Sequence, residues 1–217
     1  MIVVIQCAAR KRPDAGHLRS SDGRPVIFVA DPDNAPAQSG VVYARPDDLR
    51  EDGKSWRNAL LEYNDQREHN PLGLRAAYTL YQNSTYGRLV DKCDVESVYI
   101  LSAGWGLINA AFLTPYYDIT FSPSAAPYMR RRKWDVYRDF CMLPEGCDEE
   151  IIFFGGRDHL PLFHSLTETA RGRRTVFYNA DRAPTLPGCS LKRFETRTRT
   201  NWHYECADAF LDRCECG

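Results

Sequence analysis

The sequence predicts an α/β protein in which helices cover both faces of a mostly parallel central sheet. Short apolar β-type stretches alternate along the chain with longer segments of helical periodicity, which is typical of parallel strands joined by crossover helices. Two of these stretches end in small residues, at Cys7-Ala8-Ala9 and Ser102-Ala103-Gly104. Because the carboxyl ends of parallel strands lie at one edge of a sheet, such endings are typical of a ligand-binding edge.

The elements follow in order from these periodicities. The first strand is expected at Ile2–Gln6, and Pro25–Ala30 and Val41–Ala44 are expected to form an inserted β-hairpin. Helices are expected at Trp56–Gln66 and Leu74–Leu89, where apolar residues recur every three or four positions. The later elements, in order, are the strand Val98–Leu101, a helix around Trp134–Phe140, the strand Glu150–Phe154, the helix Asp158–Arg171, the strand Thr175–Tyr178 and the helix Trp202–Leu211.

Length and composition favour one domain. A chain of 217 residues with 43% apolar content buries a substantial core, so residues 1–217 are expected to form a single α/β domain, with Arg19–Asn70 as an insertion. No apolar stretch approaches the roughly 20 residues of a membrane span, and no early segment has the anatomy of a signal peptide. We therefore expect a cytoplasmic protein that does not enter a membrane; the oligomeric state stays open.

The charge distribution restricts nucleic-acid binding to local patches. The formal net charge is −1, so the chain is not basic as a whole. Basic residues nevertheless form clusters, each of which is also explained as a solvated face balanced by acids. The expected DNA-binding residues are Arg10, Lys11, Arg130, Arg131, Arg132, Lys133, Arg157, Arg197 and Arg199.

Eight cysteines raise the question of disulfides or a metal. Disulfides are not expected in a cytoplasmic protein. The tail residues His203, Cys206, Cys214 and Cys216 have the ligand types of a zinc site, but they include no C-x-x-C pair and no second pair at finger spacing. We expect neither a metal nor a cofactor.

Polar and aromatic side chains gather near the expected sheet edge. Gln6 follows an apolar strand directly, and Asp118 is a lone carboxylate in the turn Pro115-Tyr116-Tyr117-Asp118. The expected catalytic residues are Asp118, Gln6 and Ser102; the expected substrate-binding residues are Cys7, Asn83, Ser84, Gly104, Trp105, Tyr116, Tyr117, Gly155, Asn201 and His203. Alternatives stay open at this point: a turn or helix cap for Asp118, core packing for the aromatic rings, and a structural role for His203.

Several of these segments together resemble a known family. They are Ile5-Gln6-Cys7-Ala8-Ala9-Arg10-Lys11, Tyr81-Gln82-Asn83-Ser84, Ile100-Leu101-Ser102-Ala103-Gly104-Trp105-Gly106-Leu107, Pro115-Tyr116-Tyr117-Asp118 and Ile151-Ile152-Phe153-Phe154-Gly155-Gly156. Their order is similar to that in the YaaA-like superfamily, which includes peroxide-stress proteins and bacterial and phage relatives. The resemblance implies a fold related to uracil-DNA glycosylases, and it implies a basic DNA-binding cleft.

The residues at the expected edge suit cleavage of an N-glycosidic bond. A carboxylate stabilises the positive charge that develops on the sugar, hydrogen-bond donors stabilise the departing base, and aromatic rings stack on a flipped base. The sequence lacks the Gly-Gln-Asp-Pro-Tyr and His-Pro-Ser motifs of ordinary uracil excision. We therefore expect a DNA glycosylase for a modified base, for example a bulky phage-type base such as a glycosylated pyrimidine, with a role in antiviral defence. The alternatives are a non-enzymatic DNA-binding stress protein and a hydrolase or transferase of nucleosides or nucleotides.

Overall fold

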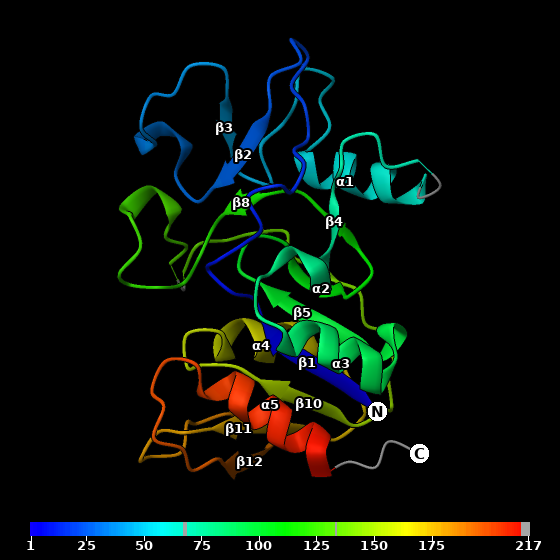
Figure 1. Cartoon of the computed structure of the whole chain (residues 1–217), viewed down its shortest axis with the longest axis vertical. Helices are drawn as coiled ribbons and strands as arrows, with labels where there is room; N and C mark the ends of the chain where they lie inside the picture. Colours follow the sequence, from blue (N-terminus) through cyan, green and yellow to red (C-terminus); the bar gives the residue numbers. More distant parts are fainter. Residues whose placement is uncertain (67–68, 133, 214–217) are drawn as a thin grey trace.

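A seven-stranded sheet is the largest sheet in the described residues and lies in the lower half of Figure 1. The computed structural model describes residues 1–66, 69–132 and 134–213, and within these residues the strand order is β12-β11-β10-β1-β5-β6-β9. The β5–β6 ladder is antiparallel and every other ladder of this sheet is parallel. The strands are β1 (Ile2–Gln6), β5 (Val98–Ser102), β6 (Gly106–Asn109), β9 (Phe140–Cys141), β10 (Ile151–Phe154), β11 (Arg174–Tyr178) and β12 (Cys189–Arg193).

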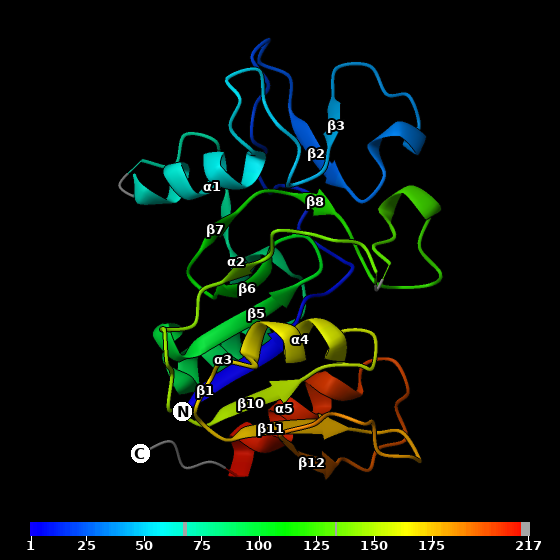
Figure 2. The same ribbon diagram turned by 180° about the vertical axis from the view of Figure 1, so that it is seen from behind.

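Helices cover both faces of this sheet, so the expected three-layer α/β architecture is confirmed. α3 (Thr85–Cys93) and α5 (Trp202–Arg213) lie on one face in Figure 1, and α4 (Leu160–Thr167) lies on the other in Figure 2. Alternate residues of a strand point to opposite faces. Accordingly, Val3 belongs to the apolar cluster beneath α3 and α5, and Val4 to the cluster beneath α4.

The segment expected as an inserted hairpin has a different topology. β2 (Val26–Val29) and β3 (Val42–Ala44) pair in parallel, so the prediction of a hairpin is wrong. The connection between them contains the 3₁₀ turn η1 (Pro32–Asn34) and carries the chain back to the starting end of β2. The other edge of β2 pairs in parallel with β8 (Tyr117–Asp118), which places Asp118 on a short strand rather than in a turn.

Two helix predictions also differ from the structure. α1 (Trp56–Asp65) forms as expected, but the segment Leu74–Leu89 divides into β4 (Arg75–Ala76), α2 (Ala77–Leu80) and the first part of α3. β4 pairs with β7 (Leu113–Thr114), and this pairing replaces a continuous helix. No helix forms in the described residues of Trp134–Phe140, because Trp134 and Val136 are 74% and 91% exposed and provide no buried face.

The remaining 3₁₀ turns are η2 (Val95–Ser97) and η3 (Pro127–Met129).

The segment Arg19–Asn70, expected as an insertion, is joined to the central sheet through a buried arginine. The Arg57 guanidinium donates hydrogen bonds to the carbonyl oxygens of Gly104, at 2.8 Å, and Trp105, at 3.1 Å, and it forms an ion pair with Asp47. Arg57 is 3% exposed. These bonds satisfy carbonyl groups in the turn between β5 and β6, so the insertion stabilises the turn at the edge of the sheet.

We expect Arg57→Met to destabilise the protein by about 3–5 kcal/mol, because removing one partner of a buried ion pair leaves the other charge without compensation. The measurement is the free energy of unfolding from urea titration. Arg88→Met is the matched control: Arg88 forms exposed ion pairs with Asp208 and Asp212, and exposed pairs contribute about 0–1 kcal/mol. Equal losses in the two variants would contradict a structural role for Arg57.

Candidate functional site

A cleft of about 880 Å³ opens at the carboxyl edge of the central sheet. β1 pairs with β5 on one edge and with β10 on the other. The chain first extends the sheet on the β5 side and later on the β10 side, so the strand order reverses at β1. Ligands of open α/β sheets bind at such points. The lining residues are Gln6, Cys7, Ala8, Ala9, Arg10, Gln82, Asn83, Thr120, Phe121, Ser122, Pro123, Gly156, Asp158, His159, Thr200, Asn201, His203 and Tyr204.

Gln6 joins three elements at the floor of this cleft. Its side-chain oxygen accepts a hydrogen bond of 2.6 Å from the Gly156 backbone N–H, and its side-chain nitrogen lies 3.2 Å from Nε2 of His203. Since the amide nitrogen only donates, Nε2 of His203 accepts and the proton of the neutral imidazole is on Nδ1. Burial lowers the pKa of His203 to about 4, which keeps this ring neutral near pH 7.

Cys7 and His159 form a second buried pair in the cleft. Cys7 Sγ lies 3.8 Å from His159 Nε2 and accepts a hydrogen bond of 3.4 Å from the Ala103 N–H. Burial, with smaller effects of His203 and Arg131, lowers the pKa of His159 to about 3. The floor of the cleft therefore combines an amide, a thiol and two neutral imidazoles.

Several lining residues were not expected from the sequence. His159 and Asp158 follow β10, and Gln82 precedes α3. The sequence signal for Asp158 and His159 was their position shortly after Gly155-Gly156, which follow a strand. Gln82 donates to the Lys11 carbonyl oxygen at 3.2 Å, so it also holds the loop after β1.

The expected substrate-binding polar residues divide into two groups. Asn83 and Asn201 line the cleft, as do Gln6, Cys7 and His203. Ser84 is exposed next to Asn83 and does not line it. Gly155 is also outside the lining, because it packs so closely on the Phe153 ring that a Cβ there would lie 2.2 Å from that ring.

The expectation for the turn after β5 is wrong at Ser102, Gly104 and Trp105. All three are buried; Trp105 is 0% exposed and packs against Phe28 and Phe140. Ser102 Oγ accepts the N–H groups of Gly104 and Trp105 at 3.2 and 3.1 Å, so the serine closes a tight turn and is not a catalytic group of the cleft.

The two tyrosines of the 115–118 motif have different positions. Tyr117 is 0% exposed, and its hydroxyl accepts a hydrogen bond of 2.8 Å from Ser102 Oγ. Tyr117 is thus a core residue and not a stacking platform for substrate, which corrects that prediction. Tyr116 is half-buried and donates to Asp118 at 3.1 Å; burial and the Asp118 charge raise the pKa of Tyr116 to about 12.

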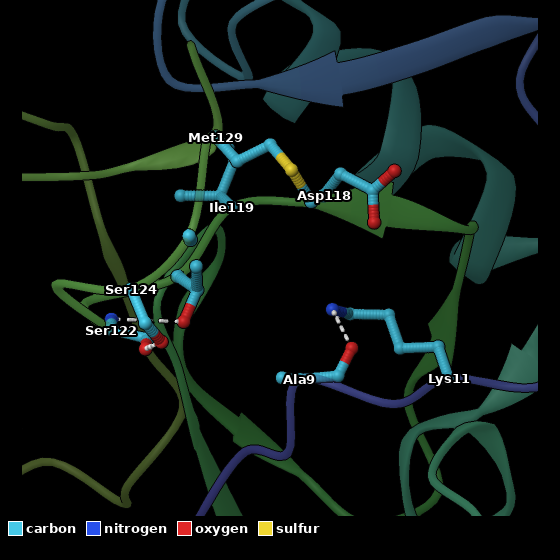
Figure 3. A pocket seen from close by; sticks show the side chains of 9 residues that line it. Ala9, Lys11, Asp118, Ile119, Ser122, Ser124 and Met129 are labelled. Atoms are coloured by element: carbon cyan, nitrogen blue, oxygen red, sulfur yellow. Dashed lines mark hydrogen bonds between the residues drawn. The ribbon is translucent and has the colours of Figure 1, made fainter. Parts of the chain in front are cut away.

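Asp118 lies in a smaller pocket of about 160 Å³ that adjoins the cleft (Figure 3). The Asp118 carboxylate, from β8, and the Lys11 side chain, from the loop after β1, point into this pocket. The pocket and the cleft share the lining residues Ala9, Thr120 and Ser122. Asp118 is therefore beside the cleft rather than among the groups at its floor.

Lys11 is buried and is not a surface contact for DNA, contrary to the sequence prediction. It is 7% exposed, its Nζ lies 4.0 Å from the centre of the Tyr117 ring, and it donates to the Ala9 carbonyl oxygen at 3.5 Å. Burial lowers the pKa of Lys11, although the charges of Cys7 and Asp118 oppose this effect.

The other expected DNA-binding residues also separate by exposure. Arg130 donates to the Ala125 carbonyl oxygen at 2.8 Å, and buried Arg131 donates to the Ala103 carbonyl oxygen at 2.9 Å and pairs with Asp139. The buried Arg131 is therefore structural, which corrects that prediction, whereas Arg130 is half-buried and its DNA contact stays a prediction. Lys133 lies outside the described residues. The exposed members are Arg10, Arg132, Arg157, Arg197 and Arg199; of these, Arg10 lines the cleft, and Arg157 and Arg199 are chain neighbours of lining residues.

Neither a metal site nor a membrane span is found in the described part of the chain. No group of three or more His, Cys, Asp or Glu side chains among residues 1–66, 69–132 and 134–213 is arranged to hold a metal ion. Cys214 and Cys216 lie outside these ranges. None of the helices described is long and apolar enough to cross a membrane.

Comparison with known proteins identifies no relative: no family model, curated protein or solved structure matches the chain. The resemblance to the YaaA-like superfamily therefore remains a prediction.

We expect the stability of the protein to decrease as the pH falls from 7 to 5. His159 and His203 have folded-state pKa values of about 3 and about 4, below the ordinary value of about 6.5, so the unfolded chain binds more protons in this range. Each buried imidazole then costs up to about 2 kcal/mol at pH 5. Urea unfolding of the wild type, His203→Asn and the exposed control His69→Asn at both pH values measures the effect. The loss should be smaller in His203→Asn, and an equal loss in all three proteins would contradict the assignment.

Proposed function

We propose that the protein is a DNA glycosylase that extrudes a modified base and hydrolyses its N-glycosidic bond. The observation that supports this proposal is the adjacency of two hollows: a large cleft with amides and neutral imidazoles, and a small pocket with a carboxylate. In the proposed complex the base occupies the cleft, the sugar faces the pocket, and the scissile bond lies at the shared residues Ala9, Thr120 and Ser122.

On the base side, the cleft has the groups that recognise a flipped base. Gln6, Asn83 and Asn201 provide amides, which hydrogen-bond to base edges, and Phe121 provides an aromatic ring. Ligand pockets have volumes of about 300–1,000 Å³, and this cleft is near the upper end. A cleft of that size suits a base with a bulky substituent, such as the glycosylated pyrimidines of phage DNA, and excision of such a base would serve antiviral defence.

On the sugar side, Asp118 is the carboxylate of the mechanism. Departure of the base leaves positive charge on the deoxyribose, and a fixed carboxylate stabilises this charge and orients the attacking water. The hydrogen bond from Tyr116 holds Asp118 in place. Donors at the cleft floor stabilise the negative charge of the departing base.

The direct test is incubation with genomic DNAs of phages that carry different base modifications, followed by alkaline cleavage and mass analysis of released bases. The proposal requires a released base and alkali-labile abasic sites from at least one DNA. A gel shift without abasic sites would favour a DNA-binding protein, and cleavage of free nucleosides or nucleotides alone would favour a nucleotide hydrolase.

Asp118→Asn should slow base release by about 10²–10⁴-fold while DNA affinity stays nearly unchanged, because the substitution removes the charge and keeps the shape. The measurement is single-turnover base release under saturating protein. Asp158→Asn, at the α4 side of the cleft, is the matched variant and should retain activity within about tenfold. The reverse result would place the reacting carboxylate at Asp158.

DNA affinity should decrease with salt although the net charge is −1, because each phosphate contact contributes about −0.9 to the slope of log affinity against log salt concentration. Replacing Arg10, Arg157 and Arg199 with Gln should make this slope less negative by about 2–3 units. Arg173→Gln, an exposed change directly before β11 and outside the cleft lining, is the control, and fluorescence anisotropy at several salt concentrations gives the slopes. An unaltered slope in the triple variant would place DNA on another surface.

A further inference from the structure

Lys11 is a buried amine that base hydrolysis does not require. The loop that carries it is fixed by backbone contacts, since Lys11 pairs with Tyr81 in an isolated β-bridge and the Arg12 N–H donates to the Leu80 carbonyl oxygen at 2.8 Å. Figure 3 shows the side chain extending into the pocket below Asp118, with its amine beside the Ala9 carbonyl oxygen. The amine is thus held in a defined position at the place where the proposed function puts the sugar.

The direct contacts of the amine are weak ones. Its hydrogen bond to Ala9 is 3.5 Å long, which is beyond the usual range for N–H···O, and its other contact is the face of the Tyr117 ring. A lysine that is desolvated in an apolar pocket is one setting in which an amine forms a Schiff base. The lowered pKa of Lys11 agrees with this setting.

We propose that Lys11 forms a Schiff base with the aldehyde of an abasic deoxyribose, so that the small pocket is an abasic-site lyase centre. This inference rests on the proposed function for the origin of the abasic site, but the chemistry needs only the abasic DNA itself. Base loss leaves a sugar hemiacetal at C1′, which opens to an aldehyde, and the pocket that adjoins the base cleft is the place where this carbon would lie.

The reaction is balanced without an oxidant or a reductant. The neutral Nζ adds to C1′ to give a carbinolamine, and uptake of one proton from solvent with loss of the hydroxyl group as water gives an iminium ion. Asp118 then accepts a proton from C2′; the electrons of that C–H bond form the C2′–C3′ double bond, and the C3′–O bond breaks with departure of the 3′ phosphate. Water finally hydrolyses the imine and releases the Lys11 amine.

The test uses a duplex oligonucleotide with one preformed abasic site, together with sodium borohydride, which reduces an imine to a stable amine. We expect a covalent protein–DNA adduct on a denaturing gel, with the modified peptide containing Lys11 by mass spectrometry. A duplex with a tetrahydrofuran abasic analogue has no aldehyde and should give no adduct.

Lys11→Arg keeps a positive charge at the same place and should reduce trapping and strand cleavage at least 100-fold. Lys54→Arg, which changes an exposed lysine that pairs with Glu62, should trap like the wild type. If Lys11→Arg does not fold, the peptide map of the wild-type adduct decides alone. The proposal is overturned by absence of an adduct, or by an adduct at another lysine or at the Met1 amine, which pairs with Glu149.

The two proposals fail independently. Release of a modified base without trapping of preformed abasic DNA would contradict the lyase and leave the glycosylase intact. Trapping at Lys11 without release of any base would support the lyase and contradict the glycosylase.

Discussion

A chain of buried hydroxyl groups connects the central sheet to both sides of the site. Ser102 Oγ and Tyr81 OH each lie 2.8 Å from Tyr117 OH. Ser102 ends β5, Tyr117 belongs to β8, and Tyr81 pairs with the loop that carries Lys11. Burial raises the pKa of Tyr81 and of Tyr117 well above the usual value, so both remain neutral donors and acceptors. The relative position of the Lys11 amine and the Asp118 carboxylate depends on this chain.

The cleft and the pocket have different electrostatic characters as a consequence of burial. At the cleft floor His159 and His203 are neutral and Gln6 satisfies the Gly156 N–H, so the floor offers hydrogen bonds with little formal charge. Formal charge lies in the pocket, on the exposed arginines of the rim and on Asp158 at the α4 side of the cleft. The proposed reaction needs this division, because hydrogen-bond donors serve the departing base, a fixed carboxylate serves the cationic sugar, and preorganised groups act most strongly where water is excluded.

The sequence was sufficient to predict the alternating architecture and part of the edge. The strand Ile2–Gln6 is apolar up to its last residue, Gln6, and the strand Ile151–Phe154 is apolar throughout and is followed by Gly155 and Gly156. The positions of Gln6 and Gly156 at the edge were therefore predictable. The pairing of β2 with β8 was not predictable, since parallel partners are distant in sequence and a two-residue strand has no periodicity. Sequence spacing also cannot separate a buried polar residue from an exposed one. Ser102 and Arg131 were therefore predicted to be functional residues, although both form hydrogen bonds with buried backbone groups.

The buried arginines influence the site although they do not face DNA. Arg57 and Arg131 donate to three successive carbonyl groups, those of Ala103, Gly104 and Trp105, and Asp139 lies between their guanidinium groups. The turn therefore cannot shift without exposing unpaired carbonyls to an apolar core, which is costly. The Ala103 N–H in the same turn donates to Cys7 Sγ, and the Arg131 charge helps to lower the pKa of His159. The position of the Cys7–His159 pair consequently depends on a turn held by arginines that do not line the cleft.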